Sequence, residues 1–167
     1  MARLAPNIST LTELEKVWLA AMIDGEGTIG IYRSRRPKCR SGWRYYPVVS
    51  INNTNRRIID KFAKLTDTWI TRIRNYMPKN PNGKRIYNAE IRYKAVGAFL
   101  EQIRPYLIAK GDQADLAFEF IELQRGVGQR NYHLLEPFND LYIRSRLLNH
   151  RGREPLDVSV LQLTEVV

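Results

Sequence analysis

The segment Leu19–Gly27 joins a helical pattern directly to a strand pattern, and no other feature restricts the possible fold as much. Thr12-Glu13-Leu14-Glu15 has the spacing of a capping box, which predicts that a helix begins just after Thr12. Apolar residues then recur at helical spacing, and Gly25 and Gly27 end the helix. Residues 28–36 alternate between apolar and polar, which predicts a strand that follows without a loop.

The rest of the chain continues this mixed pattern. It predicts strands at 45–53, 69–77 and 84–94, and helices at 56–65, 95–104, 112–125 and 137–150. Four antiparallel strands with helices on one face make an α+β, two-layer αββαββα domain with extra C-terminal helices. We expect one domain over residues 1–167, with a core at about 12–150 and a tail at 151–167. Nothing in the chain is expected to cover the other sheet face, so that face could lie along a nucleic-acid groove.

The composition favours a polyanionic partner. Lysine and arginine number 27 against 17 acidic residues, a formal net charge of +10, which points to nucleic acid before a membrane surface. Cys39 is the only cysteine, so an internal disulfide and a cysteine-based zinc site are excluded. The first ten residues lack the apolar core of a signal peptide, and no apolar run reaches the roughly 18 residues of a membrane span. We therefore expect a soluble, intracellular protein.

The acidic turn at the end of the first predicted helix carries the chemistry. A carboxylate at Glu26 lies at the negative end of the helix dipole, where it is unfavourable. Two such turns meeting across a twofold axis would repel each other unless cations lay between them. The arrangement favours a hard divalent ion, typically Mg²⁺, with Mn²⁺ or Ca²⁺ as substitutes, held by Glu26 and the backbone carbonyl of Gly25. The alternative is an amphipathic helix that ends in a solvated turn.

Leu-Ala-Ala-Met-Ile-Asp-Gly-Glu-Gly at 19–27 resembles the LAGLIDADG motif at nearly every position. The chain is therefore similar to the single-motif, homodimeric LAGLIDADG homing endonucleases. Ala21 replaces the family's usual glycine, and Glu26 replaces its commoner aspartate. The resemblance implies a four-stranded, saddle-shaped sheet that binds double-stranded DNA. It also implies metal-dependent hydrolysis that leaves short 3′ overhangs in a long pseudo-palindromic target, by an intron-encoded protein in a prokaryotic cytoplasm or an organelle.

The same resemblance implies further site residues. Lys110 follows Pro105-Tyr106-Leu107 and corresponds to the family's active-site lysine, as a base or a charge stabiliser near the scissile phosphate. A polar residue that orients a metal-bound water corresponds to Asn53 or Asn52, with Asn53 preferred, and a basic pocket residue to Arg56 or Arg57. The paired helices would meet through Trp18, Ala20, Ala21, Ile23 and Asp24.

The outward face of the predicted sheet supplies the candidate DNA contacts. They are Tyr32, Ser34, Arg36, Arg44, Ser50, Arg72, Arg74, Tyr76, Arg85 and Arg92, while Lys38, Arg40 and Lys79 in loops are expected to contact phosphates. Two other functions fit the same fold, an RNA maturase that helps an intron to fold and a DNA-binding regulator without catalysis. The acid at Glu26 and the lysine at Lys110 argue against a purely structural role.

Overall fold

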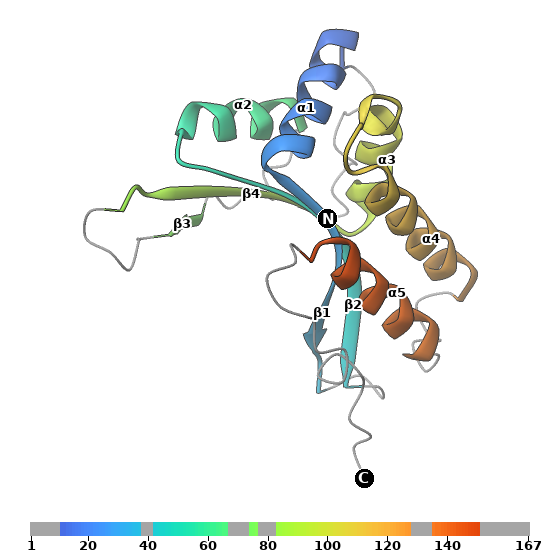
Figure 1. Ribbon diagram of the computed structural model, residues 1–167. Coiled ribbons are helices and arrows are strands. Elements are labelled where there is room, and N and C mark those ends of the chain that lie inside the picture. Colours follow the sequence, from blue (N-terminus) through green and yellow to red (C-terminus); the bar gives the residue numbers. More distant parts are fainter. Residues whose placement is uncertain (1–10, 38–41, 67–73, 77–82, 128–134, 151–167) are drawn as a thin grey trace, which may run out of the picture. The chain divides into compact units, whose positions relative to one another are not determined.

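The computed structural model describes residues 11–37, 42–66, 74–76, 83–127 and 135–150, the backbone alone at 74–76 and 135. The observed order confirms the α+β prediction (Figure 1). The elements are α1 (Glu13–Glu26), β1 (Gly27–Arg35), β2 (Trp43–Asn53), α2 (Arg56–Thr66), β3 (Arg74–Tyr76), β4 (Ile86–Arg92), α3 (Lys94–Ile103), the short 3₁₀ helix η2 (Arg104–Tyr106), α4 (Gly111–Val127) and α5 (Leu135–Leu148). No described helix is both long and apolar enough to cross a bilayer.

The four strands form one sheet in the order β1-β2-β4-β3, in which β4 runs antiparallel to both β2 and β3. The register places Val49 opposite Ile91 and Ile51 opposite Ala89, so these buried side chains share one face. Helices α2 and α3 pack against β4 (Figure 1). The sheet and these helices therefore bury an apolar layer, which is the main stabilising term in such a fold.

The chain divides into two compact units, each built from two separate stretches of sequence. The first comprises residues 1–29 and 48–111, and the second comprises 30–47 and 112–167. Strands β1 and β2 pass from one unit into the other. The expectation of a single domain stays a prediction.

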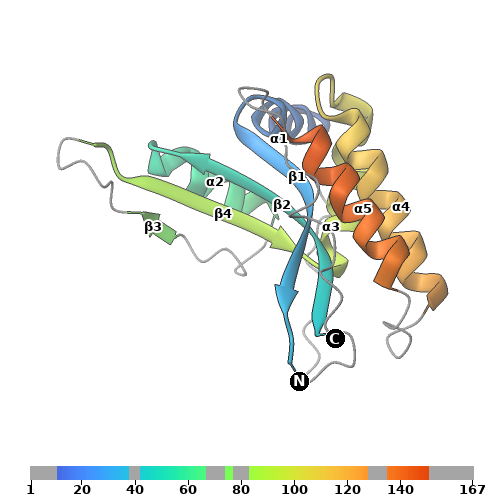
Figure 2. The ribbon, with the colours of Figure 1, turned by 60° about the horizontal axis from the view of Figure 1, so that its bottom comes forward.

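Each unit has its own aromatic core. In the first unit the rings of Phe62 on α2 and Phe99 on α3 lie 5.9 Å apart, edge to face. In the second unit Phe120 and Phe138 lie 5.4 Å apart, and Tyr45 stacks on Phe138 at 6.4 Å. Helices α4 and α5, which supply Phe120 and Phe138, run side by side (Figure 2). Aromatic side chains bury the largest areas per residue, so these contacts anchor both units.

Most of the predicted element bounds are off by one or two residues, and those of α1, β2 and β4 bear on the site. Helix α1 continues to Glu26, so Gly25 lies inside the helix and Gly27 alone ends it. Strand β2 begins at Trp43, two residues earlier than expected, and β4 is shorter than the predicted 84–94. Of the predicted strand 69–77, residues 74–76 form β3 and the others lie outside the described residues. The capping box at Thr12 is confirmed, with both of its hydrogen bonds present.

Candidate functional site

The turn from α1 to β1 depends on the absence of a side chain at Gly27. The Gly27 N–H donates to the carbonyl of Ile23 and closes the helix, while its own backbone is already extended. A Cβ at this position would lie 2.8 Å from the Ile23 Cα and 2.9 Å from its carbonyl oxygen. Those atoms are backbone and cannot move aside, so only glycine allows a strand to follow the helix so closely. Glu26 is left exposed as the last residue of α1.

Asp24, two positions before Glu26, forms hydrogen bonds within the chain. Its Oδ2 accepts a 2.7 Å hydrogen bond from the backbone N–H of Ile108, and its Oδ1 accepts one of 3.0 Å from the N–H of Lys110. Both carboxylate oxygens therefore hold the segment between η2 and α4. A carboxylate engaged in this way is poorly placed to bind a cation, which leaves Glu26 as the acid that is available in this turn.

The Lys110 side chain also contacts the end of α1, here as a donor to backbone carbonyls. Its ammonium donates to the carbonyl of Ile23 at 2.8 Å and also to the carbonyl of Asp24. Lys110 is only 8% exposed, and α1 has no basic residue in its own last turn. The ammonium thus supplies the positive charge that a helix C-terminus favours. Donation to two carbonyls suits a charged lysine, and the expected role of Lys110 as a base or a charge stabiliser stays a prediction.

The second predicted part of the pocket lies where β2 turns into α2. Asn53 accepts a 2.8 Å hydrogen bond from the N–H of Asn55 through its side-chain oxygen, and Asn55 caps α2 in the same manner by accepting from the N–H of Arg57 at 3.0 Å. Arg56 pairs with Asp60 at 3.3 Å, an exposed contact of little energetic weight. The Arg57 side chain is exposed and has no ionic partner among the described residues, which makes it the more available of the two arginines.

On the sheet face opposite α2 and α3, the register brings polar residues of β2 and β4 together. Asn52 lies opposite Asn88, and Ser50 lies opposite Glu90. The Asn88 amide nitrogen donates to the Asn52 side-chain oxygen at 2.8 Å, and its own oxygen is buried without a partner among the described atoms. Glu90 accepts from Nε of Arg92 at 2.7 Å. Sequence reasoning missed Asn88 and Glu90, although their alternation with Arg92 could have identified them.

This face is less open than the sequence predicted. Val48, Ser50 and Asn88 retain only 1–5% exposure, so the expectation of an uncovered face is wrong at these positions. Small side chains are shielded by longer neighbours across a strand pair, as Ser50 is opposite Glu90. Ser50 can reach a base only if such neighbours move.

The remaining predicted DNA contacts differ in how accessible they are. Tyr32 is 37% exposed, and its ring lies 6.4 Å from that of Tyr46, a neighbour that the prediction missed. Arg36 and Arg85 are exposed, whereas Ser34, Arg44 and Arg92 are half-buried. Arg74 and Tyr76 belong to β3, but their side chains lie outside the described set, as do Arg72, Lys38, Arg40 and Lys79 entirely.

The predicted helix-pairing surface on α1 must be corrected. Ala20 and Ile23 are fully buried in this chain's own core, so neither can contact a second chain. Residues on the opposite side of the helix are exposed, with Leu14 83% and Val17 44% exposed and Ala21 also exposed. Small residues at 20 and 21 look equivalent in the motif, but one helical step of about 100° places them on different faces.

The other two predicted pairing residues, Trp18 and Asp24, are both partly exposed. The Trp18 ring is engaged by the Lys61 ammonium, 4.3 Å from its centroid. The accessible stripe along α1 is therefore Leu14, Val17, Trp18, Ala21 and Gly25.

The donor set at the α1–β1 turn suits a hard cation but is incomplete. Within the described part of the chain, no three His, Cys, Asp or Glu residues gather as a metal site. The Glu26 carboxylate is exposed and makes no hydrogen bond or ion pair with described residues, and the Gly25 backbone beside it is open, with nothing within 4 Å of a Cβ built there. Carboxylate and carbonyl oxygens are the ligands that Mg²⁺ prefers. One chain thus offers part of a coordination shell, which phosphate oxygens or a second chain would have to complete.

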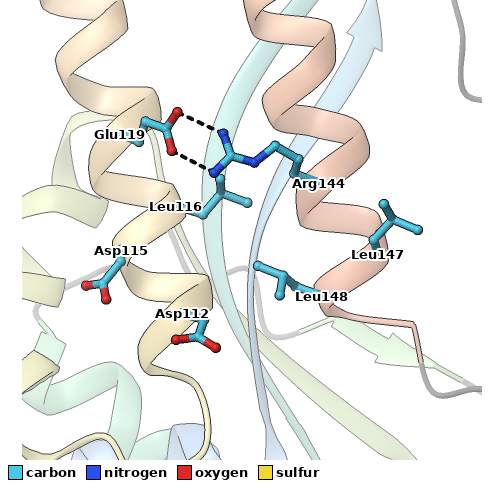
Figure 3. Close-up of a pocket in the computed structure, with 7 residues that line it drawn as sticks. All are labelled: Asp112, Asp115, Leu116, Glu119, Arg144, Leu147 and Leu148. Carbon is cyan, nitrogen blue, oxygen red and sulfur yellow. Dashed lines mark hydrogen bonds and ion pairs between the residues drawn. The ribbon is translucent and has the colours of Figure 1, made fainter.

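A separate pocket of about 510 Å³ lies between α4 and α5 in the second unit (Figure 3). Asp112, Asp115 and Glu119 line it from α4, and Arg144 faces them from α5. The two Arg144 Nη atoms donate to the Glu119 carboxylate at 2.8 and 3.0 Å, so the single cation is already neutralised. The pocket is therefore net acidic and would repel a phosphate backbone.

Comparison of whole structures finds the same fold in homing endonucleases. I-CvuI, solved in complex with the I-CreI target in the presence of Mg, superposes with a TM-score of 0.68 at 18% identity, over 89% of this chain and 90% of that one. The archaeal intron-encoded homing endonuclease I-Vdi141I, complexed with DNA, gives 0.69 at 17% identity over 89% and 92%. The LAGLIDADG homing endonuclease I-SmaMI, bound to cleaved DNA, gives 0.59 at 16% identity over 89% of this chain but 48% of that one.

Comparisons based on sequence find no match. No protein-family model matches the chain, and no curated protein matches it. The chain therefore has the fold of the LAGLIDADG homing endonucleases, as the nine-residue motif predicted.

Proposed function

We propose that this protein is a site-specific DNA endonuclease of the homing type, which hydrolyses both strands of a long, partly palindromic target. The observation that carries the proposal is the exposed Glu26 carboxylate at a helix end, fixed by the glycine-dependent turn into β1. The same fold occurs in proteins whose structures contain DNA. A net charge of +10 provides the affinity for a polyanion.

At the cleavage centre, Glu26 and the carbonyl of Gly25 would hold a divalent cation, Mg²⁺ in the first instance. Such a cation would supply the positive charge that phosphodiester hydrolysis requires. Asn53, with its oxygen tied to the turn, would present its amide nitrogen, and Arg57 or Arg56 would face the phosphates. Cuts on opposite strands would leave short 3′ overhangs, as the resemblance implies.

The polar sheet face would read the target. Tyr32, Ser34, Arg44 and Arg92, with Arg74 of β3 and Arg72, would contact base edges or phosphates in the major groove, and Arg36 and Arg85 at strand ends would contact phosphates. An intron-encoded origin is also proposed, because I-Vdi141I, which has the same fold, is an intron-encoded endonuclease.

The active form would be a homodimer in which two α1 helices pair about a twofold axis. Three observations support it. The motif occurs once, the stripe from Leu14 to Gly25 is exposed, and this chain spans only 48% of I-SmaMI. Two active sites are needed to cut two strands, and a second copy provides the second one.

A library cleavage assay tests the proposal. The full chain would be incubated with randomised duplex DNA and Mg²⁺, beside Glu26→Gln and the exposed α3 control Glu101→Gln. We expect the wild type and the control to cut a defined subset, and Glu26→Gln to bind that subset without cutting. Binding without cutting by the wild type would favour the DNA-binding regulator, and binding to intron RNA alone would favour the maturase.

A further inference from the structure

We propose that Glu90 is a specificity-determining residue of the polar sheet face, which selects a base that carries an amino group and keeps Arg92 from binding phosphates of any sequence. The inference rests on the proposed function, because it names the class of base that the same face would recognise. It gives a use to an acidic side chain on a surface proposed to bind a polyanion.

The charge of Glu90 is unusual for its position. Among the strand residues that the structure describes, Glu90 is the only acid. It alternates with Asn88 and Arg92 along β4 and lies opposite Ser50 of β2, so it belongs to the polar sheet face. DNA phosphates repel a carboxylate, so Glu90 lowers the affinity of this face for DNA unless it binds a donor.

The Glu90 carboxylate holds the guanidinium of Arg92. Its Oε2 accepts a 2.7 Å hydrogen bond from Nε of Arg92 and another from Nη2 of the same group. The side chains of Glu90 and Arg92 are only 17% and 25% exposed, so solvent screens their attraction less than in a surface pair. An arginine paired in this way presents little net charge to a phosphate, so Arg92 adds little to the binding of arbitrary DNA.

The second oxygen of the carboxylate can read a base. Within the described part of the chain, Oε1 of Glu90 makes no hydrogen bond. An ionised carboxylate accepts hydrogen bonds and cannot donate them. In the major groove the base donors are the amino groups of cytosine and adenine, whereas guanine and thymine present oxygen acceptors there. Glu90 would therefore favour cytosine or adenine at the position it faces and disfavour guanine or thymine.

A purely structural ion pair predicts a different pattern. Loss of a structural pair would lower the free energy of unfolding without changing the preference at any one base pair. The proposed role instead predicts that removing the carboxylate strengthens binding to DNA of random sequence and weakens discrimination at one position. Affinity and discrimination thus change in opposite directions.

Binding to a duplex of random sequence tests the hold on Arg92. The full chain would be compared with Glu90→Gln, Arg92→Met, the double variant and Glu101→Gln, which makes the same change of charge on the exposed surface of α3. We expect Glu90→Gln to bind about tenfold more tightly at about 0.1 M salt, with a slope of log K against log salt that is steeper by about 0.9, because Arg92 gains roughly one phosphate contact. The gain should fall below about twofold in the Arg92→Met background, and Glu101→Gln should stay within about twofold of the wild type.

Binding to single-base variants of a target tests the reading of the base. The target is first selected by binding, and divalent metal is left out so that no strand is cut. We expect the wild type and Glu101→Gln to prefer cytosine or adenine by about tenfold at one position of each half-site. Glu90→Gln should lose this preference, because an amide both donates and accepts hydrogen bonds.

Binding of random DNA that stays the same or weakens in Glu90→Gln would overturn the proposal, as would an equal gain in the Arg92→Met background or an unchanged preference profile. Should Glu90→Gln fail to fold, Glu90→Ala removes the same carboxylate and decides the same question. Cleavage by the wild type with no effect of Glu90 refutes this inference alone. Selective binding that depends on Glu90, without cleavage in Mg²⁺, refutes only the proposed nuclease.

Discussion

The side-chain nitrogen of Asn88 lies 2.8 Å from the side-chain oxygen of Asn52, its direct partner across β2 and β4. Asn52 is exposed and its oxygen is engaged, so in the proposed DNA complex its amide NH₂ would donate to a base acceptor in the major groove. Asn88 is 4% exposed and can act only through Asn52.

We therefore expect Asn52→Ala and Asn88→Ala to relax preference at the same base pair of each half-site, by about 1–3 kcal/mol. The double variant should lose no more than Asn52→Ala alone, because both changes remove one contact. Cleavage profiles on single-base target variants would measure this, with the exposed neighbour Thr54→Ala as the control. Relaxation at two different base pairs would contradict the arrangement.

Two adjacent alanines test the pairing of α1 helices. Ala21 is exposed and Ala20 is fully buried, so a glutamate has opposite consequences at the two positions. Ala21→Glu should yield a folded monomer by sedimentation, with wild-type thermal stability after allowance for dimer dissociation. Ala20→Glu should unfold the chain, since an unpaired buried carboxylate costs several kcal/mol. A stable dimer of Ala21→Glu would exclude this helix face as the interface.

A substitution of Ser145 on α5 tests a buried hydrogen bond in the second unit. The buried hydroxyl oxygen of Ser145 accepts a 2.8 Å hydrogen bond from the backbone N–H of Ile31 in β1. Ser145→Ala should lower the free energy of unfolding by about 1–3 kcal/mol, because it leaves a buried donor without its partner. Urea denaturation measures the change, and the exposed neighbour Arg146→Ala should stay within about 0.5 kcal/mol of the wild type.

Acid should weaken the start of α1. Hydrogen bonds from the backbone and hydroxyl of Thr12 lower the pKa of Glu15 below its ordinary value of 4.5. A carboxylate with a lowered folded pKa adds stability above the unfolded pKa and loses it as the pH falls through the folded one. The difference in the free energy of unfolding between the wild type and Glu15→Gln should therefore be largest at neutral pH and disappear in acid. Thermal unfolding followed from pH 7 downward measures it, and a difference that persists in acid would contradict the role of the carboxylate.

Much of the fold could be predicted from sequence because its signals are local. The capping box at Thr12 and the alternation of apolar and polar residues in β1 and β4 are visible in neighbouring residues of the sequence. Strand ends were less accurate, since the start of β2 depends on Trp43, whose ring packs under the Arg33 guanidinium at 4.7 Å. Contacts of this kind come from tertiary structure, which periodicity does not report.

The candidate site, too, could be predicted where its signals are local in sequence and not where they depend on tertiary contacts. The motif located Glu26 because helix, turn and strand adjoin there in sequence. It could not reveal that Asp24 and Lys110 hydrogen-bond each other's segments, since 86 positions separate them. Nor could small residues at 20 and 21 show which one faces outward, because that depends on which side of α1 the core occupies.

The two glycines that flank Glu26 would respond differently to selection in the laboratory. A Cβ at Gly27 meets the backbone of Ile23, so a randomised library filtered only for folded protein should already return glycine there. A Cβ at Gly25 meets nothing within 4 Å, so the same filter should accept many residues at that position. If selection of the same library for DNA cleavage then accepts fewer kinds of residue at position 25 than selection for folding, the decrease measures the constraints that the second helix, the cation and the DNA impose on this position.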